Sequence, residues 1–236
     1  MIIEGEIAGV GPYRIAPVDL GTLTIPVGAR MGGRILAVRG YVVSHPGGTL
    51  QFDTGLGAEH PGFDAVLTAM RNPIGEAMEA AGLSVLDITC VANCHLHYDH
   101  CGGNPSFPAV PTFVQRRDYE ARETINWYVE DRVDFPGGDL RLIDGEHEVL
   151  PGLRLVPTPG HTPGHQSLII DDEAGAVVLA GQAAYTAAEF ADPREEPARG
   201  WKTAWNGDAF LESIAYLKSL KPQCVYFAHD EAVWPS

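Results

Sequence analysis

Two stretches near the start of the chain have a pattern of apolar residues that is typical of β-strands. Residues 34–43, RILAVRGYVV, and residues 49–53, TLQFD, are rich in β-branched and aromatic residues, and a Pro-Gly-Gly turn lies between them. Runs of this kind, separated by Pro and Gly, are typical of two strands joined by a tight reversal. The pattern predicts a β-hairpin in this part of the chain.

Helical patterns occur at two places. Residues 63–81 favour a helix by their Ala, Met, Leu and Glu content, although Pro73 should break or restart it. Residues 206–222 predict a second helix, with Asn206 as a candidate N-cap and Pro222 as its end. Its apolar side chains fall on one helical face: Phe210, Leu211, Ile214 and Leu217.

The rest of the chain is rich in short apolar runs that predict strands. They cover residues 85–94, 110–114, 141–144, 153–158, 165–172, 175–180 and 223–230. The sequence shows no internal repeat and no interdomain linker, and 236 residues lie within the size range of one large α/β domain. We therefore expect a single domain that spans residues 1–236.

Two irregular, polar stretches interrupt this pattern, at residues 123–138 and 189–205. Both could be lids over a site, or loops that their aromatic residues anchor onto the core. These aromatic residues are Trp127, Tyr128, Phe135, Trp201 and Trp205.

The charge of the chain narrows the range of partners. Sixteen Lys and Arg against 31 Asp and Glu give a formal net charge of −15, which repels phosphate backbones and anionic lipid surfaces. The first residues, MIIEGEIAGV, lack the basic leader of a signal peptide, and no apolar run reaches the ~20 residues of a membrane span. We expect a cytoplasmic protein that binds neither nucleic acid nor membranes.

The four cysteines are too few for a disulfide framework. Three of them, Cys90, Cys94 and Cys101, crowd into one stretch, and Cys224 lies near the end of the chain. Their spacing lacks the paired CxxC knuckles of a structural zinc site. Both buried free thiols and metal ligation remain open for them.

The segment CVANCHLHYDHCGG, residues 90–103, holds three histidines and an aspartate within six positions. His95 and His97 are two residues apart, so in an extended chain their side chains leave on the same side and can hold one ion. Asp99 continues this alternation, and a turn could give Asp99 and His100 to a second ion. Imidazole nitrogens with a carboxylate suit Zn²⁺ first, and Fe or Mn next.

Further ligands for such a site lie next to predicted strand ends. The segment TPGHTPGH offers His161 and His165, and YFAHDE offers His229. A single histidine in any of these places would usually be a packed or solvated ring. The dense cluster at residues 95–100 makes a shared metal site the stronger interpretation.

These motifs resemble the metallo-β-lactamase superfamily over nearly the whole chain. The His-x-His-x-Asp-His motif stands as His95, His97, Asp99 and His100, and FDTG around Asp53 resembles an early strand-end motif. The resemblance implies an α/β (α+β) fold, a four-layer αββα sandwich with the site at one edge of two facing sheets.

Within the superfamily the chain is most similar to N-acyl homoserine lactonases. The similarity lies in HLHYDHCGGNPSF leading to VQRRDYEA, in TPGHTPGHQSL and in AYT after the strand at residues 175–180. It implies one ion held by His95, His97 and His165, and another by Asp99, His100 and His229. It also implies His161 as a neighbour and not a ligand, Tyr185 beside the substrate carbonyl, and Asp53 orienting a ligand histidine.

The chain departs from this family at Gln182. The family places there an aspartate whose carboxylate bridges both ions. An amide oxygen can coordinate a metal, but it brings no charge and bridges poorly. We expect the second ion to be held more weakly, so that one or two ions bind.

The resemblance implies hydrolysis of a lactone or similar ester by a metal-activated water. Tyr185 would donate a hydrogen bond to the developing oxyanion, and Asp99 would carry the proton to the leaving alkoxide. For Tyr185 a core aromatic with a satisfied hydroxyl remains the alternative. The rival functions are hydrolysis of a thioester, β-lactam or phosphodiester, and a noncatalytic metalloprotein; a homodimer is compatible with each.

Overall fold

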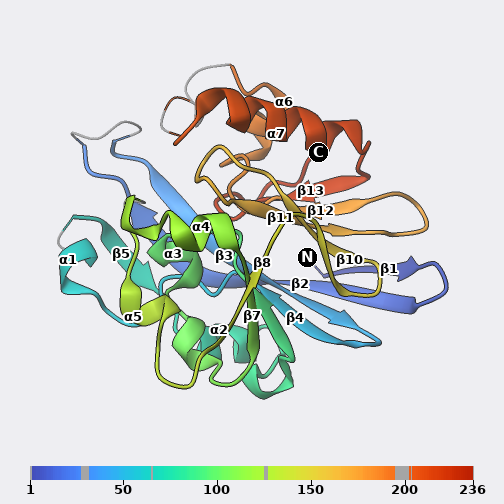
Figure 1. Cartoon of the computed structure of the whole chain (residues 1–236), viewed down its shortest axis with the longest axis horizontal. Coiled ribbons are helices and arrows are strands. Elements are labelled where there is room, and N and C mark those ends of the chain that lie inside the picture. Colours follow the sequence, from blue (N-terminus) through green and yellow to red (C-terminus); the bar gives the residue numbers. More distant parts are fainter. Residues whose placement is uncertain are drawn as a thin grey trace.

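The computed structural model describes residues 2–27, 32–64, 66–124, 127–194, 202 and 204–235. Its strands form two sheets that face each other (Figure 1). The first sheet has the order β1-β2-β3-β4-β6-β7-β8, with β5 paired to β2. Its strands are β1 (Ile3–Ile7), β2 (Gly11–Thr24), β3 (Ile35–His45), β4 (Gly48–Phe52), β5 (Thr68–Arg71), β6 (Cys90–Ala92), β7 (Pro111–Gln115) and β8 (Asp139–Ile143).

The second sheet has the order β13-β12-β11-β10-β9. All neighbours in it are antiparallel except β12 and β13, which run parallel. Its strands are β9 (His147–Leu150), β10 (Leu153–Pro157), β11 (Gln166–Ile170), β12 (Val177–Leu179) and β13 (Cys224–Tyr226).

Helices cover the outer faces of both sheets (Figure 1). The α-helices are α1 (Pro61–Asp64), α2 (Ile74–Ala80), α3 (Tyr98–Cys101), α4 (Arg116–Glu120), α5 (Glu130–Val133), α6 (Ala187–Ala191) and α7 (Gly207–Ser219). Short 3₁₀ helices lie at Val85–Asp87, Asn104–Ser106 and Arg122–Thr124. Helix α2 packs on the first sheet, and α6 and α7 pack on the second. The result is the expected αββα sandwich.

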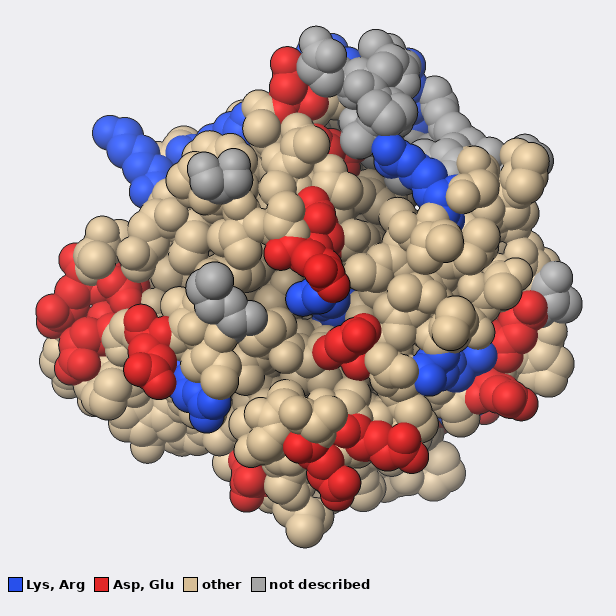
Figure 2. All heavy atoms as spheres, turned by 180° about the vertical axis from the view of Figure 1, so that it is seen from behind, with Lys and Arg blue, Asp and Glu red and all other residues tan. Residues whose placement is uncertain are grey.

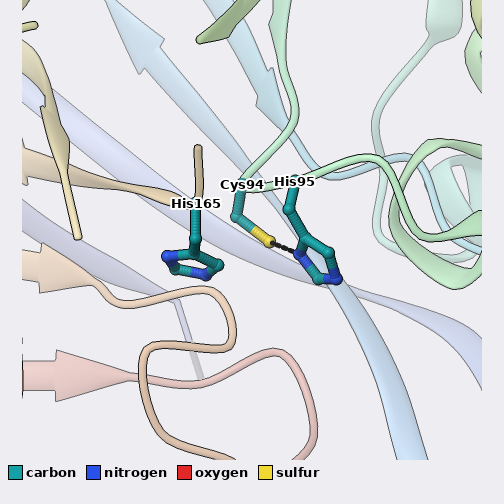
Figure 3. A group of neighbouring side chains, drawn as sticks. All are labelled: Cys94, His95 and His165. Carbon is teal, nitrogen blue, oxygen red and sulfur yellow. Dashed lines mark hydrogen bonds between the residues drawn. The ribbon is translucent and has the colours of Figure 1, made fainter. Parts of the chain in front are cut away.

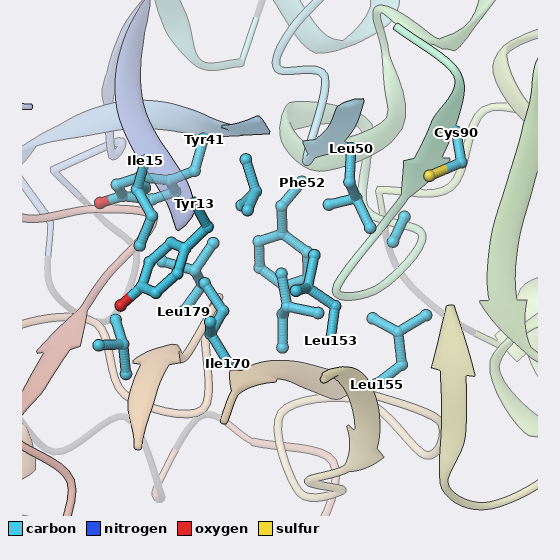
Figure 4. Close-up of a cluster of buried hydrophobic side chains, with 14 of the residues drawn as sticks. Tyr13, Ile15, Tyr41, Leu50, Phe52, Cys90, Leu153, Leu155, Ile170 and Leu179 are labelled. Carbon is cyan, nitrogen blue, oxygen red and sulfur yellow. The ribbon is translucent and has the colours of Figure 1, made fainter. Parts of the chain in front are cut away.

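The main apolar core lies between the two sheets (Figure 4). The first sheet contributes Ile15, Leu50 and Phe52, and the second contributes Leu153 and Leu168, all of them buried. Burying a side chain of this size contributes roughly 1.5–3 kcal/mol relative to exposure. This core holds the sheets together and thereby aligns the strand ends at one edge of the sandwich.

The predicted hairpin and the predicted late helix are confirmed. Strands β3 and β4 pair antiparallel, with Tyr41 opposite Phe52. At the start of α7 the Asn206 side chain accepts hydrogen bonds from the backbone N–H groups of Asp208 and Ala209. The α7 residues Phe210, Ile214 and Leu217 are buried against the second sheet.

The helix predicted over residues 63–81 is wrong in its middle. Residues Thr68–Arg71 form β5, which pairs with β2 so that Met70 lies opposite Thr22. The composition of this segment favours a helix, but pairing with the edge of a long strand outweighs such a weak local preference. Strands β1, β2 and β9 were not predicted from the sequence.

The irregular stretch at residues 123–138 is anchored to the body of the protein where it is described. Trp127 packs on Phe63, with ring centroids 5.4 Å apart, and Val133 is buried. This arrangement supports the anchored-loop interpretation there. Of residues 189–205, the segment 195–201 and residue 203 lie outside the described residues, and the lid prediction falls largely on them.

Charged side chains are spread over the surface. On the face shown in Figure 2, acidic side chains gather at several places, and Lys and Arg lie singly or in small groups between them. Every helix in the described part of the chain is too short or too polar to span a bilayer.

Candidate metal centre

Strand ends from both sheets deliver the predicted site residues to one place. Asp53 follows β4, and the 93–101 segment that carries the His-x-His-x-Asp-His motif follows β6. The TPGHTPGH segment joins β10 to β11, and His229 follows β13. The backbone N–H of Gln166 donates to the Cys94 carbonyl at 2.8 Å, which ties the two sheets together beside the site.

Three histidine rings pack around His95, with His97 and His161 edge to face and His100 tilted. Its ring centroid lies 4.4 Å from that of His97, 4.2 Å from His100 and 4.7 Å from His161. His100 in turn lies 5.1 Å from His229. The His100 and His229 rings, which lie more than 100 residues apart in the sequence, are therefore in direct contact.

The structure brings together the set expected for a second ion. Ligand atoms of Asp99, His100 and His229 lie within 4.8 Å of one another. The Asp99 carboxylate is 3.4 Å from His100 Nε2 and 3.7 Å from His229 Nε2. This is the spacing of groups that can share one cation.

The set expected for the first ion is only partly assembled. His95 and His97 meet as predicted, but their third neighbour within 4.8 Å is His161, which was expected to be no ligand. His165 groups instead with His95 and Cys94 (Figure 3). The His165 ring is held from both sides, since Nδ1 lies 2.9 Å from Thr158 Oγ1 and Nε2 accepts from the Gln182 N–H at 3.0 Å.

Asp53 lies behind the site and holds it by both carboxylate oxygens. Oδ1 accepts the Cys94 backbone N–H at 2.7 Å, and Oδ2 lies 2.9 Å from His100 Nδ1. A hydrogen bond at Nδ1 leaves Nε2 as the nitrogen that faces the site. The geometry is that of a residue that orients a ligand histidine.

Gln182 and Tyr185 follow β12 and line the same space. Gln182 Oε1 lies 3.0 Å from His100 Nε2. The Tyr185 ring stacks on His229, with centroids 5.7 Å apart, and meets the His161 ring edge-on at the same distance. Tyr185 thus lies between the two groups of candidate ligands.

Burial and mutual repulsion keep most of these rings neutral. Burial lowers the pKa of His97 to about 4 and that of His165 to about 3, and burial together with the neighbouring rings lowers the pKa values of His95 and His161 well below the ordinary histidine value. A neutral imidazole has a free lone pair on one nitrogen, which is what a metal ion requires. These four rings are therefore prepared for a cation and not for a proton.

His100 and Asp99 shift in opposite directions. Burial lowers the pKa of His100, but the Asp99 and Asp53 carboxylates outweigh it and raise the pKa to about 9. Burial raises the pKa of Asp99, but His100 and His229 outweigh it and lower the pKa. Asp99 is thus ionised at neutral pH.

Two buried ring nitrogens test whether these residues suit a metal. His95 Nε2 and His161 Nδ1 are buried and have no hydrogen-bond partner in the described structure. Unpaired buried polar atoms cost free energy, and native proteins rarely leave them. With a donor set of imidazoles and a carboxylate, the site fits a divalent cation.

Sequence reasoning assigned no role to Asp118 in α4, inside the quoted VQRRDYEA segment. Its buried carboxylate accepts the Leu96 N–H and the Gly164 N–H, each at 2.9 Å. Asp118 therefore joins the 95–97 and 161–165 segments. The sequence shows only an aspartate that lies between two glycine-containing motifs. Its role becomes visible only from the residues that it contacts in the folded protein.

The fold and the site together define a class: a two-sheet αββα protein with a histidine-rich cluster at the strand ends that can hold a metal ion. A model of the metallo-β-lactamase superfamily matches residues 34–229. The chain belongs to this superfamily.

Within this superfamily the chain is similar to proteins named N-acyl homoserine lactonases. The chain is 38% identical over 158 residues to an N-acyl homoserine lactonase of Bacillus cereus, and the match covers 65% of this chain and 60% of that protein. It is 31% identical over 222 residues to N-acyl homoserine lactonase AttM of Azorhizobium caulinodans, covering 83% and 82%. The chain thus spans about 60% of the length of the first of these relatives.

A solved structure agrees over a longer part of the chain. It is of an N-acyl homoserine lactone hydrolase with the product N-hexanoyl-L-homoserine bound at its catalytic metal centre. The TM-score is 0.75 at 27% identity, covering 94% of this chain and 97% of that one.

Proposed function

We propose that this protein is a metal-dependent hydrolase that opens the lactone ring of N-acyl homoserine lactones, a quorum-quenching activity. The observation that carries the proposal is the cluster of buried histidines and Asp99 with an unpaired Nε2 on His95. The relatives named as N-acyl homoserine lactonases support the choice of substrate class.

The candidate ligands divide into two groups. His95 and His97 would hold one ion together with His165 or His161, and Asp99, His100 and His229 would hold the other. Zn²⁺ is the expected metal because the donors are mainly imidazole nitrogens, with Fe or Mn as alternatives. A bound Zn²⁺ would lower the pKa of its water to about 7 and would polarise the substrate carbonyl.

Asp99 is the proposed proton carrier. Its carboxylate is ionised because His100 and His229 lower its pKa. It can accept a proton from the attacking water and pass it to the alkoxide that leaves when the ester C–O bond breaks.

Tyr185 is the proposed hydrogen-bond donor to the oxyanion. Stacking on the His229 ring holds the phenol beside the candidate ligands. A donor placed in advance at the developing charge stabilises the transition state without reorganisation. Burial of the surrounding rings excludes bulk water and strengthens this interaction.

Turnover of N-acyl homoserine lactones by zinc-loaded protein tests the proposal. We expect hydrolysis in the wild type and loss of at least about 100-fold in His97→Ala, because that variant removes a ligand of the ion that activates water. His147→Ala is the matched control, since His147 lies on β9 against Phe113 and should leave turnover unchanged.

A lactone panel of several acyl chain lengths decides the outcome. No turnover above that of His97→Ala on any of these lactones would sink the lactonase proposal. Chromogenic thioesters, β-lactams and phosphodiesters in the same assay distinguish the rival hydrolases. Gln182 is the observation that favours the noncatalytic alternative, in which metal binds and no ester is cleaved.

The binding partners, the localisation and the oligomeric state stay predictions. The acidic surface supports a protein that binds neither nucleic acid nor membranes. Cytoplasmic localisation and a homodimer also stay predictions, which fractionation of cells and light scattering would test.

A further inference from the structure

Cys94 lies in contact with two candidate ligands of the proposed metal centre, His95 and His100, and Figure 3 shows the contact with His95. Its sulfur is 3.1 Å from His95 Nδ1 and 3.3 Å from His100 Nδ1, and the residue is fully buried. The sulfur therefore approaches both rings from their Nδ1 sides, away from the Nε2 atoms.

The surrounding backbone holds the sulfur in this place. Gly181 has a positive φ of 58°, and a Cβ there would lie 2.8 Å from the Cys94 sulfur and 2.4 Å from its Cβ. Only glycine fits at 181 while the thiol occupies this space. On the other side the Asp53 carboxylate accepts the Cys94 N–H and forms a hydrogen bond with its thiol.

The two nitrogens of His95 have different surroundings. Nδ1 faces the sulfur, and Nε2 is buried with no partner in the described structure. If the hydrogen were on Nε2, a buried N–H would lack an acceptor, which is unfavourable. With the hydrogen on Nδ1, the sulfur accepts it and the Nε2 lone pair is free.

We propose that Cys94 is a positioning residue that accepts the Nδ1–H of His95 and so presents Nε2 to the metal ion. This role rests on the metal binding of the proposed function. Asp53 then orients both rings, His100 directly and His95 through the thiol, whose S–H it accepts. Neutral thiol sulfur is a weak acceptor, so His95 is held less firmly than His100.

Metal affinity of matched variants tests this role. Zn²⁺ and Co²⁺ affinities are measured by chelator competition in the wild type, Cys94→Ala, Cys94→Ser and Cys90→Ala. We expect Cys94→Ala to weaken binding about 10- to 100-fold, as loss of a partner behind a ligand histidine does. The Ser hydroxyl also accepts an N–H, so Cys94→Ser should restore most of the affinity.

The control and a spectroscopic measurement separate positioning from packing. Cys90 is a buried thiol on β6 for which no ring contact is described, so Cys90→Ala should bind metal like the wild type. The Co²⁺ protein should lack a sulfur-to-cobalt charge-transfer band. Long-range ¹H–¹⁵N spectra of zinc-loaded, ¹⁵N-histidine-labelled wild type should show a protonated Nδ1 on His95, which needs no variant to fold.

Three results would overturn the role: wild-type affinity in Cys94→Ala, a charge-transfer band that Cys94→Ser removes, or an unprotonated Nδ1 on His95. The second would make the sulfur a direct ligand. A wild type that binds no ion would overturn the proposed function and this role together. A wild type that binds metal but opens no lactone would overturn the proposed function alone.

Discussion

At the residue scale, single hydrogen bonds decide which ring nitrogens can bind an ion. His165 has both nitrogens engaged, by Thr158 and by the Gln182 N–H, whereas His95 and His161 each keep one buried nitrogen unpaired. The Gln182 side chain approaches His100 Nε2, the nitrogen that a second ion would need. The neutral amide therefore competes with that ion for His100 Nε2, and it adds no negative charge that would attract the ion.

Changing Gln182 to Asp should raise the metal content. The wild type should hold between one and two ions per chain after gel filtration, and Gln182→Asp should come closer to two, because a carboxylate adds a negative charge that can bridge. Inductively coupled plasma mass spectrometry measures the ratio. Gln182→Asn is the control that keeps the amide and should not increase it. Tight occupancy of two ions in the wild type would contradict this reasoning.

At the scale of elements, short connections align the site more than long helices do. Helix α4 has only five residues, yet its Asp118 holds both the 95–97 segment and the 161–165 segment. Burial raises the pKa of this carboxyl group, and the Thr162 side chain and the two backbone N–H groups offset part of that effect. The segments that carry the histidines are thus fixed by one buried acceptor.

Removing this acceptor should loosen both segments. In Asp118→Ala the buried N–H groups of Leu96 and Gly164 lose their partner, which costs about 1–3 kcal/mol for each group. Urea denaturation should show the lower free energy of unfolding, and chelator competition should show weaker zinc binding. Asp131→Ala is the control, because Asp131 is exposed on α5 and should change stability by less than about 0.5 kcal/mol. Equal stability of the two variants would refute the role of Asp118.

At the scale of the whole molecule, the sandwich is joined at its edges as well as through its core. Asp172, after β11, accepts the Tyr13 hydroxyl at 2.8 Å and the Glu6 N–H at 3.2 Å, both from the first sheet. Burial raises the pKa of Asp172, but the hydrogen bonds from Ala174, Tyr13 and Glu6 outweigh it and lower the pKa. That residues 1–236 form one domain stays a prediction, which a single cooperative unfolding transition would support.

The Asp172 link should make stability depend on pH. Its folded-state pKa is below the unfolded value of about 3.9, so its contribution is complete above that pH and is lost as pH falls through the folded pKa. Asp172→Asn should therefore lower the free energy of unfolding at pH 7, and the difference from the wild type should narrow below about pH 4. Glu173→Gln, at the exposed neighbouring position, is the control. A difference that stays constant from pH 7 to pH 3 would rule out this explanation.

The sequence predicted correctly those elements for which several local features indicate the same structure. The hairpin of β3 and β4 and the capped helix α7 belong to this class, because turn, cap and periodicity point to the same structure there. Thr68–Arg71 shows the opposite case, since its helix-forming composition gives way to pairing with β2. A local sequence pattern does not specify which strand a segment will pair with.

The residues alone specify the chemistry of the site, because three histidines and an aspartate within six positions after an apolar strand have few uses other than binding a cation. The αββα sandwich was expected only because motifs spread along the chain resemble those of the metallo-β-lactamase superfamily. The tertiary structure alone decided which rings meet: it placed His161 beside His97, locked His165 and set the Cys94 sulfur behind His95. These contacts depend on the register of strands far apart in sequence and on buried hydrogen bonds, and both arise only when the two sheets pack.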